Sequence, residues 1–197
     1  MQVYILKESN SDSRVAASPD TVKKMKDWGL NVVIQDNAGL NSNFSNEEYI
    51  KSGAIISDEI NEISKSDLIL KINKPNDDEI ALMNEGSVLI ASLDPYNNSE
   101  TLNKLKDKGV TSFAIELMPR ITRAQSMDIL SSQSNLAGYK AVIDATYLFN
   151  KAMPMMMTAA GTIAPAKVMV FGAGVAGLQA IATAKRLGAI VSATDVR

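Results

Sequence analysis

The amino-acid sequence predicts an α/β protein built from parallel sheets with flanking helices. Short runs rich in β-branched residues recur through residues 1–130, and segments with helix caps and helical spacing separate them. The same alternation resumes near the C-terminus, where an apolar run leads into a glycine-rich turn. Such alternation is typical of parallel sheets, because each helix returns the chain to the start of the next strand. We therefore expect two α/β domains, the first formed by residues 1–130.

Several strands and helices are expected within this first domain. Ser18 and Pro19 combine a helix N-cap with a first-turn proline, and Ser45 with Glu48 forms a capping box. Ser99 is expected to cap a further helix. The expected strands are Val3–Leu6, Val32–Gln35, Leu68–Ile72, Val88–Ala91 and Thr111–Ala114.

Residues 131–150 are expected to form a helix that connects the two domains. This stretch contains no proline, and its apolar side chains are spread around the helix rather than along one stripe. A helix of that pattern is usually buried on several sides. Residues 151–197 then begin the second domain.

The second domain opens with a pattern typical of dinucleotide sites. A β-branched run leads into Gly172-Ala-Gly174-Val-Ala-Gly177, a helical segment follows, and a second apolar run ends at Asp195. The first glycine permits a tight turn, the second lets a pyrophosphate approach the backbone, and the third lets helix and strand pack closely. The residues expected to bind the dinucleotide are Gly172, Gly174, Val175, Ala176, Gly177, Asp195, Val196 and Arg197.

The order of these features favours a dinucleotide site over a glycine-rich turn without a ligand. Free N–H groups at a helix start bind phosphate oxygens. Asp195 follows Gly174 by about 20 positions, where a carboxylate accepts hydrogen bonds from an adenosine ribose. The same charge repels a 2′-phosphate, so NAD(H) is expected rather than NADP(H). A complete Rossmann domain has about six strands. Two are predicted after Gly161, so we expect an incomplete Rossmann-like domain in a truncated chain.

The composition excludes several classes of function. The 197 residues are 46% apolar, the net charge is −2, and the sequence contains neither cysteine nor histidine. A disulfide framework and a thiolate metal site are therefore excluded, and no metal centre is expected. The charges are interspersed, so no nucleic-acid partner is expected. We expect neither a signal peptide nor a membrane span, because the first ten residues lack a basic stretch followed by a long apolar core and no apolar run is long enough to span a bilayer.

A polar stretch precedes the predicted connecting helix and contains Arg120, Gln125, Asp128 and Ser131. From spacing alone, this is a polar loop in which Asp128 caps a helix and Arg120 makes a surface ion pair. Three segments are more specific. They read PRITRAQSMDILSSQSNLAGYKAV, PMMMTAAGTI and FGAGVAGLQAIATAKRLGA. They closely resemble the NAD(H)-binding component, the alpha subunit, of proton-translocating nicotinamide nucleotide transhydrogenases, within the alanine dehydrogenase/transhydrogenase family.

The resemblance implies a function. Such a component exchanges hydride between NAD(H) and NADP(H), and the NADP(H) is bound on a partner component. By resemblance, Arg120 and Asp128 position the nicotinamide carboxamide and its ribose, Ser131 assists, and Gln125 reaches toward NADP(H). The resemblance also implies a membrane component that carries protons, a homodimer, and a cytoplasmic location at the inner membrane through partner subunits. Hydride transfer needs positioning more than acid–base chemistry, so the lack of histidine is no obstacle.

Two alternatives remain at this point. Alanine dehydrogenases have a similar start, and Arg14 matches an arginine that binds the substrate carboxylate in that family. However, Asn73 and Asp94 stand where the resemblance places its catalytic lysine and histidine. Amino-acid oxidation needs a proton acceptor tuned near neutrality, so these replacements disfavour it. The second alternative is an NAD-binding module without activity of its own.

Overall fold

The computed structural model describes residues 1–9 and 11–196 and divides into two compact units. Unit 1 is Met1–Met118 and unit 2 is Pro119–Arg197. Residues 119–130 thus group with unit 2, whereas the sequence placed them in the first domain. The reason is local, because the 3-10 turn Thr122–Met127 leads directly into a long helix of unit 2.

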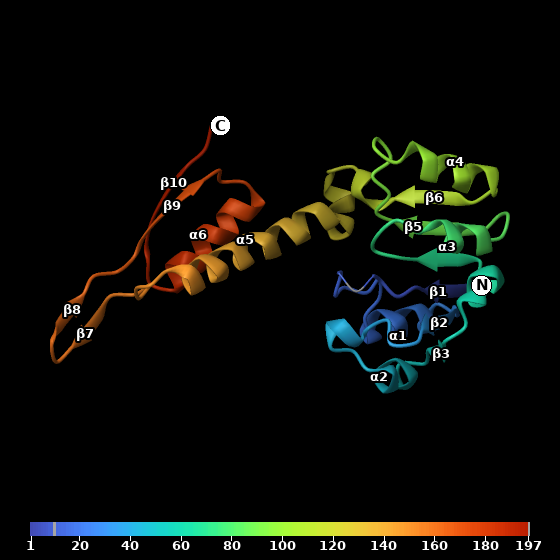
Figure 1. Ribbon diagram of the computed structural model, residues 1–197, viewed down its shortest axis with the longest axis horizontal. Helices are drawn as coiled ribbons and strands as arrows, with labels where there is room; N and C mark the ends of the chain where they lie inside the picture. Colours follow the sequence, from blue (N-terminus) through green and yellow to red (C-terminus); the bar gives the residue numbers. More distant parts are fainter. Residues whose placement is uncertain (10, 197) are drawn as a thin grey trace. The chain divides into compact units, whose positions relative to one another are not determined.

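Unit 1 contains a six-stranded sheet in which every adjacent pair of strands is parallel. The strand order is β3-β2-β1-β4-β5-β6, which is the order of a Rossmann fold (Figure 1). The predicted α/β class with parallel sheets is confirmed. The strands are β1 Gln2–Ile5, β2 Asn31–Gln35, β3 Ile55–Ser57, β4 Leu68–Leu70, β5 Val88–Ala91 and β6 Thr111–Ala114.

Helices cover both faces of this sheet. Successive residues of a strand point to opposite faces, so Val3 and Tyr4 belong to different hydrophobic cores. Val22 of α1 and Tyr49 of α2 join the core of Val3, and Leu105 of α4 joins that of Tyr4. The helices are α1 Pro19–Asp27, α2 Asn46–Lys51, α3 Asp77–Leu82 and α4 Ser99–Asp107.

The helix starts follow from their caps. Ser18 accepts a hydrogen bond from the Thr21 amide, and Ser45 with Glu48 forms the expected capping box. The prediction for α4 was wrong, because Ser99 is its first residue and follows an N-cap residue whose side chain makes no capping hydrogen bond. The expected elements also did not include α3, which begins with a capping box of its own, or β3, a short strand at the edge of the sheet.

Unit 2 combines two packed helices with two small sheets. Helix α5 (Ile129–Leu148) packs along α6 (Val175–Arg186), and β9 pairs in parallel with β10. The antiparallel strands β7 and β8 form a hairpin that extends away from the α5–α6 pair (Figure 1). The strand bounds are β7 Met156–Thr158, β8 Gly161–Ile163, β9 Lys167–Phe171 and β10 Ile190–Thr194.

Helix α5 differs from the predicted connecting helix in two respects. It begins two residues before 131, because Asp128 serves as its N-cap, and it ends at Leu148. Its buried residues are Gly138 and Val142, so the expectation of burial on several sides was wrong. Among the described helices, none combines the length and the apolar character needed to cross a membrane.

Candidate functional site

The glycine-rich turn of unit 2 has the geometry that the sequence predicted. Gly172 adopts a φ of +94°, a conformation that side chains other than glycine rarely adopt. Its amide donates to the Thr194 carbonyl at 2.7 Å, which ties the turn to β10. A Cβ atom at Gly177 would overlap the carbonyl oxygen of Gly172. Glycine at both positions is therefore required for this close connection between β9 and α6.

The start of α6 presents unpaired backbone donors. Gly174 is its N-cap residue and offers no side-chain acceptor. The amide of Leu178 donates to the Gly174 carbonyl, whereas the amides of Val175, Ala176 and Gly177 have no backbone or side-chain acceptor among the described residues. A helix start of this kind carries a partial positive charge and binds anions.

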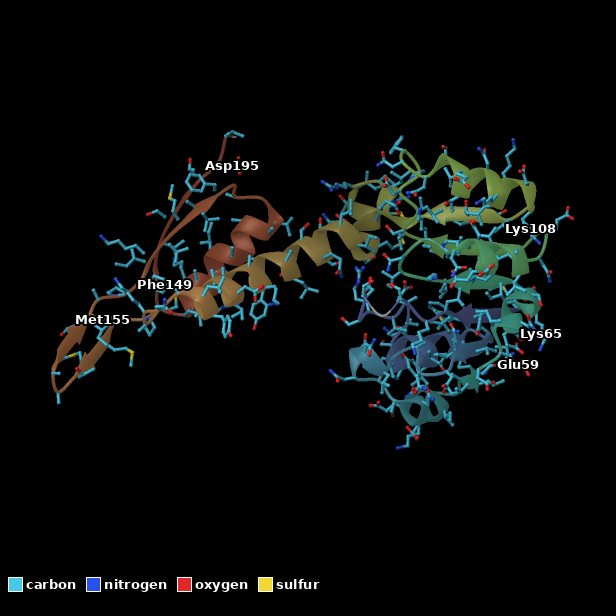
Figure 2. All side chains as sticks on the ribbon, in the orientation of Figure 1. Glu59, Lys65, Lys108, Phe149, Met155 and Asp195 are labelled. Carbon is cyan, nitrogen blue, oxygen red and sulfur yellow. The ribbon has the colours of Figure 1, made fainter. Side chains whose placement is uncertain are left out.

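Asp195 lies against the glycine turn, directly after β10 (Figure 2). Its Oδ2 atom accepts a hydrogen bond from the Ala173 amide at 2.6 Å. The next predicted residue, Val196, is fully exposed. The last, Arg197, lies outside the described residues.

Asp128 and Ser131 form the N-terminal cap of α5. The Ser131 amide donates to Oδ1 of Asp128 at 2.9 Å, and the Ser131 hydroxyl donates to Oδ2 at 2.6 Å. These hydrogen bonds lower the pKa of the Asp128 carboxyl, and the positive charge of Arg120 contributes further. The simple interpretation of Asp128 as a helix cap is thus correct. The other expectation from spacing was a surface ion pair of Arg120. No such ion pair is observed within the described part of the chain.

One pocket of about 380 Å³ joins the polar loop to the glycine turn. It brings together Arg120, Ser131 and five predicted dinucleotide residues, and none of the described residues that line it has a carboxylate side chain. Gln125, Asp128, Asp195 and Val196 do not line it. The lining residues are Arg120, Leu130, Ser131, Ser134, Phe171, Gly172, Gly174, Val175, Ala176 and Gly177.

Two residues of α5, one that lines this pocket and one that lies near it, were not predicted from the sequence. Ser134 follows Ser131 by one helical turn, a spacing that places both on one face of a helix. Gly138 lies one further turn along, and a Cβ atom there would overlap the carbonyl oxygen of Ala176. The Ser-x-x-Ser-x-x-x-Gly spacing could have been interpreted as one helix face, but nothing in it identifies the partner helix.

Comparison with known proteins assigns the chain to a family. The family model described as "Alanine dehydrogenase/PNT, N-terminal domain" matches residues 4–137, and its C-terminal counterpart matches residues 141–197. The chain belongs to the alanine dehydrogenase/PNT family.

Within this family, the similarity is greater to transhydrogenases. The chain is 51% identical to an NAD(P) transhydrogenase alpha-subunit protein of Rhodospirillum rubrum, over 100% of the chain and 53% of that protein. It is 31% identical to the alanine dehydrogenase of Bacillus subtilis, over 95% of the chain and 50% of that protein. The crystal structure of a transhydrogenase from Sinorhizobium meliloti matches with a TM-score of 0.97 and 55% identity, over 100% of the chain and 59% of that structure.

These findings confirm the predicted resemblance to transhydrogenase alpha subunits. They also support membership of an oxidoreductase family that binds nicotinamide nucleotides. The chain spans about half the length of the curated relatives that it matches.

Three residues that were compared with alanine dehydrogenases lie in unit 1. Arg14 matches a substrate-binding residue of that group, whereas Asn73 and Asp94 differ from its catalytic residues. The guanidinium group of Arg14 contacts the Asp12 carboxylate at 2.6 Å, and this contact holds the pKa of Asp12 well below its usual range. Asn73 donates to Asp12 at 2.8 Å and to Glu8 at 2.9 Å. Asp94 accepts hydrogen bonds from Asn97 in the loop after β5. Arg14, which was matched to a substrate-binding residue, is thus paired with a carboxylate of the same chain, Asp12.

Proposed function

We propose that this chain is the NAD(H)-binding part of a proton-translocating transhydrogenase. It would transfer hydride between NAD(H) bound in unit 2 and NADP(H) bound on a partner component. The observation that carries the proposal is the pocket in which Arg120 and Ser131 lie beside the glycine turn. The similarity to proteins named as NAD(P) transhydrogenase alpha subunits supports it.

The residues of unit 2 would hold and orient the dinucleotide. The free amides at the start of α6 suit its pyrophosphate, and Arg120 adds a positive charge to the same pocket. Asp128 fixes Ser131 and the start of α5, and Gln125 is exposed on the same loop. The bound nicotinamide ring supplies the hydride chemistry itself. The protein therefore needs to position the ring and exclude water, and needs no histidine.

Asp195 is the basis for proposing NAD(H) rather than NADP(H). Its carboxylate lies at the end of β10, against the glycine turn, where an adenosine ribose binds in Rossmann folds. A 2′-phosphate there would bring like charges together.

The remaining assignments concern the assembly. We propose that an NADP(H)-binding component and a membrane component that carries protons act with this chain, and that the chain forms a homodimer. Its position would then be cytoplasmic, at the inner membrane through those partner subunits. The subunit names of the relatives support the existence of partners.

Hydride exchange in a reconstituted system tests the proposal. The protein is mixed with the NADP(H)-binding component of a transhydrogenase, NADH and an NADP⁺ analogue whose reduction is measured by absorbance. Reduction is expected when both proteins are present and absent when either is omitted. A folded protein that binds NADH but gives no exchange would instead be a binding module without activity.

Alanine dehydrogenase activity is the disfavoured alternative. Asn73 and Asp94 stand at the positions matched to the catalytic lysine and histidine, and both side chains are engaged in hydrogen bonds within unit 1. Neither position therefore carries the lysine or the histidine that the dehydrogenase reaction would use.

A further inference from the structure

The pocket at the start of α6 is lined by two serines, Ser131 and Ser134, whose hydroxyl groups differ in their hydrogen bonding. The Ser131 hydroxyl donates its proton to Asp128 at 2.6 Å. A hydroxyl group has a single proton to donate, so Ser131 cannot donate to a ligand without giving up its hydrogen bond to Oδ2 of Asp128. The donors for an anion in this pocket must therefore come from elsewhere.

Ser134 has a hydroxyl group that no described residue engages. It is half-buried and lines the pocket one turn after Ser131. The neighbouring Ser132 is exposed and donates to the Ile129 carbonyl at 3.1 Å, as helix serines often do. The Ser134 hydroxyl therefore has no partner to give up among the described residues and is available to donate to a ligand in this pocket.

Gly138 explains how α5 brings this hydroxyl group to the start of α6. Gly138 and Ser134 are four residues apart and lie on the same face of the helix. A Cβ atom at Gly138 would overlap the carbonyl oxygen of Ala176 in the first turn of α6. The two backbones are thus in direct contact, and Ser134 lies beside the free amides.

We propose that Ser134 binds the diphosphate of the dinucleotide, with its hydroxyl donating to a phosphoryl oxygen that the α6 amides also hold. The pocket suits this group because it contains Arg120 and free backbone donors, and its lining, as far as the structure describes it, has no carboxylate side chain. The inference deepens the proposed function and rests on it. Helix α5 would then supply part of the phosphate site that a glycine motif normally supplies alone.

Titrations of NADH and inorganic pyrophosphate test this role. The protein is titrated with NADH by its fluorescence, and pyrophosphate is then used to displace NADH. Loss of a hydrogen bond to a charged group predicts that Ser134→Ala binds both ligands about tenfold more weakly. Ser134→Thr keeps a hydroxyl group and should retain most of the affinity. Ser132→Ala is the matched control on the same helix and should bind as the unmodified protein does.

The outcomes separate this inference from the proposed function. If the unmodified protein binds no NADH, both are wrong. If it binds NADH and Ser134→Ala binds both ligands with unchanged affinity, only the role of Ser134 is wrong. Equal weakening by Ser132→Ala would also overturn it, because the effect would then come from the helix and not from the hydroxyl group. Thermal melts of each variant identify any loss of folding.

Discussion

Asp195 is positioned by a backbone contact that does not need its charge. The Ala173 amide donates to its carboxylate, and an asparagine side chain could accept the same hydrogen bond. Under the proposed function, the negative charge sets the choice of nucleotide. The two contributions of this residue can therefore be separated by removing the charge and keeping the shape.

We predict that Asp195→Asn loses the preference for NAD(H). NADPH should bind about tenfold more tightly, because the repulsion of the 2′-phosphate is removed, and NADH should bind less tightly. Fluorescence titration with both nucleotides measures the ratio. Asp107→Asn, at the end of α4 in unit 1, is the control and should leave the ratio unchanged. An unaltered ratio in Asp195→Asn would remove Asp195 from nucleotide selection.

Asp128 also combines two roles that need to be separated. It caps α5, and the resemblance assigns it to the nicotinamide end of the dinucleotide. We predict that Asp128→Ala lowers the melting temperature and slows hydride transfer more than it weakens NADH binding. Asp128→Ser keeps a capping oxygen, so its melting temperature should stay near that of the unmodified protein. Slow transfer in Asp128→Ser would assign the effect to the carboxylate, and normal transfer would assign it to the cap.

The pH dependence of this cap follows from its lowered pKa. A carboxyl group with a lower pKa in the folded protein contributes stability that is complete above its unfolded pKa. That stability is lost as the pH falls through the folded value. The contribution of Asp128 should therefore be constant at neutral pH and disappear only in acid. A melt series from pH 7 to strongly acidic conditions, compared with Asp128→Ser, isolates it.

At the scale of helices and strands, local signals in the sequence predicted most of the fold. The caps of α1 and α2 were predictable because a few adjacent residues determine them. The cap of α3 was equally predictable, as Asn76 and Glu79 have capping-box spacing. The edge strand β3 was not, because three residues carry too little periodicity. The α5–α6 contact was also not predictable, since Gly138 acquires meaning only once Ala176 lies opposite it.

We predict that Gly138→Ala destabilises unit 2. Replacing glycine by alanine inside a helix normally adds about 0.5–1 kcal/mol of stability. Here the new methyl group would overlap the Ala176 carbonyl, and overpacking of this kind costs about 1–3 kcal/mol. The variant should therefore unfold at a lower temperature and bind NADH more weakly. Asn135→Ala, exposed on the same helix, is the control and should be neutral or slightly stabilising. A stabilised Gly138→Ala would contradict the close contact of α5 with α6.

At the scale of the whole molecule, the candidate site was only partly predictable. The glycine turn and Asp195 belong to a short contiguous pattern, so their proximity followed from the sequence. Arg120 and Ser131 are distant from that pattern in sequence, and only their resemblance to a family suggested a shared site. Ser134 required the packed helices, because its pocket forms between segments about 40 residues apart.

Unit 1 has a parallel sheet with the strand order of a Rossmann fold. At the positions matched to the catalytic lysine and histidine of alanine dehydrogenases it has Asn73 and Asp94. We predict that the protein with NAD⁺ and L-alanine produces no NADH, measured by absorbance, under conditions in which NADH binding is detected. The physical reason is twofold. Asp12 holds the Arg14 guanidinium, and no histidine is present to accept the substrate proton. Asp12→Ala removes this carboxylate from Arg14 and should still yield no activity, because the proton acceptor remains absent. Alanine oxidation by either protein would show that another group accepts the proton, and would restore the dehydrogenase interpretation.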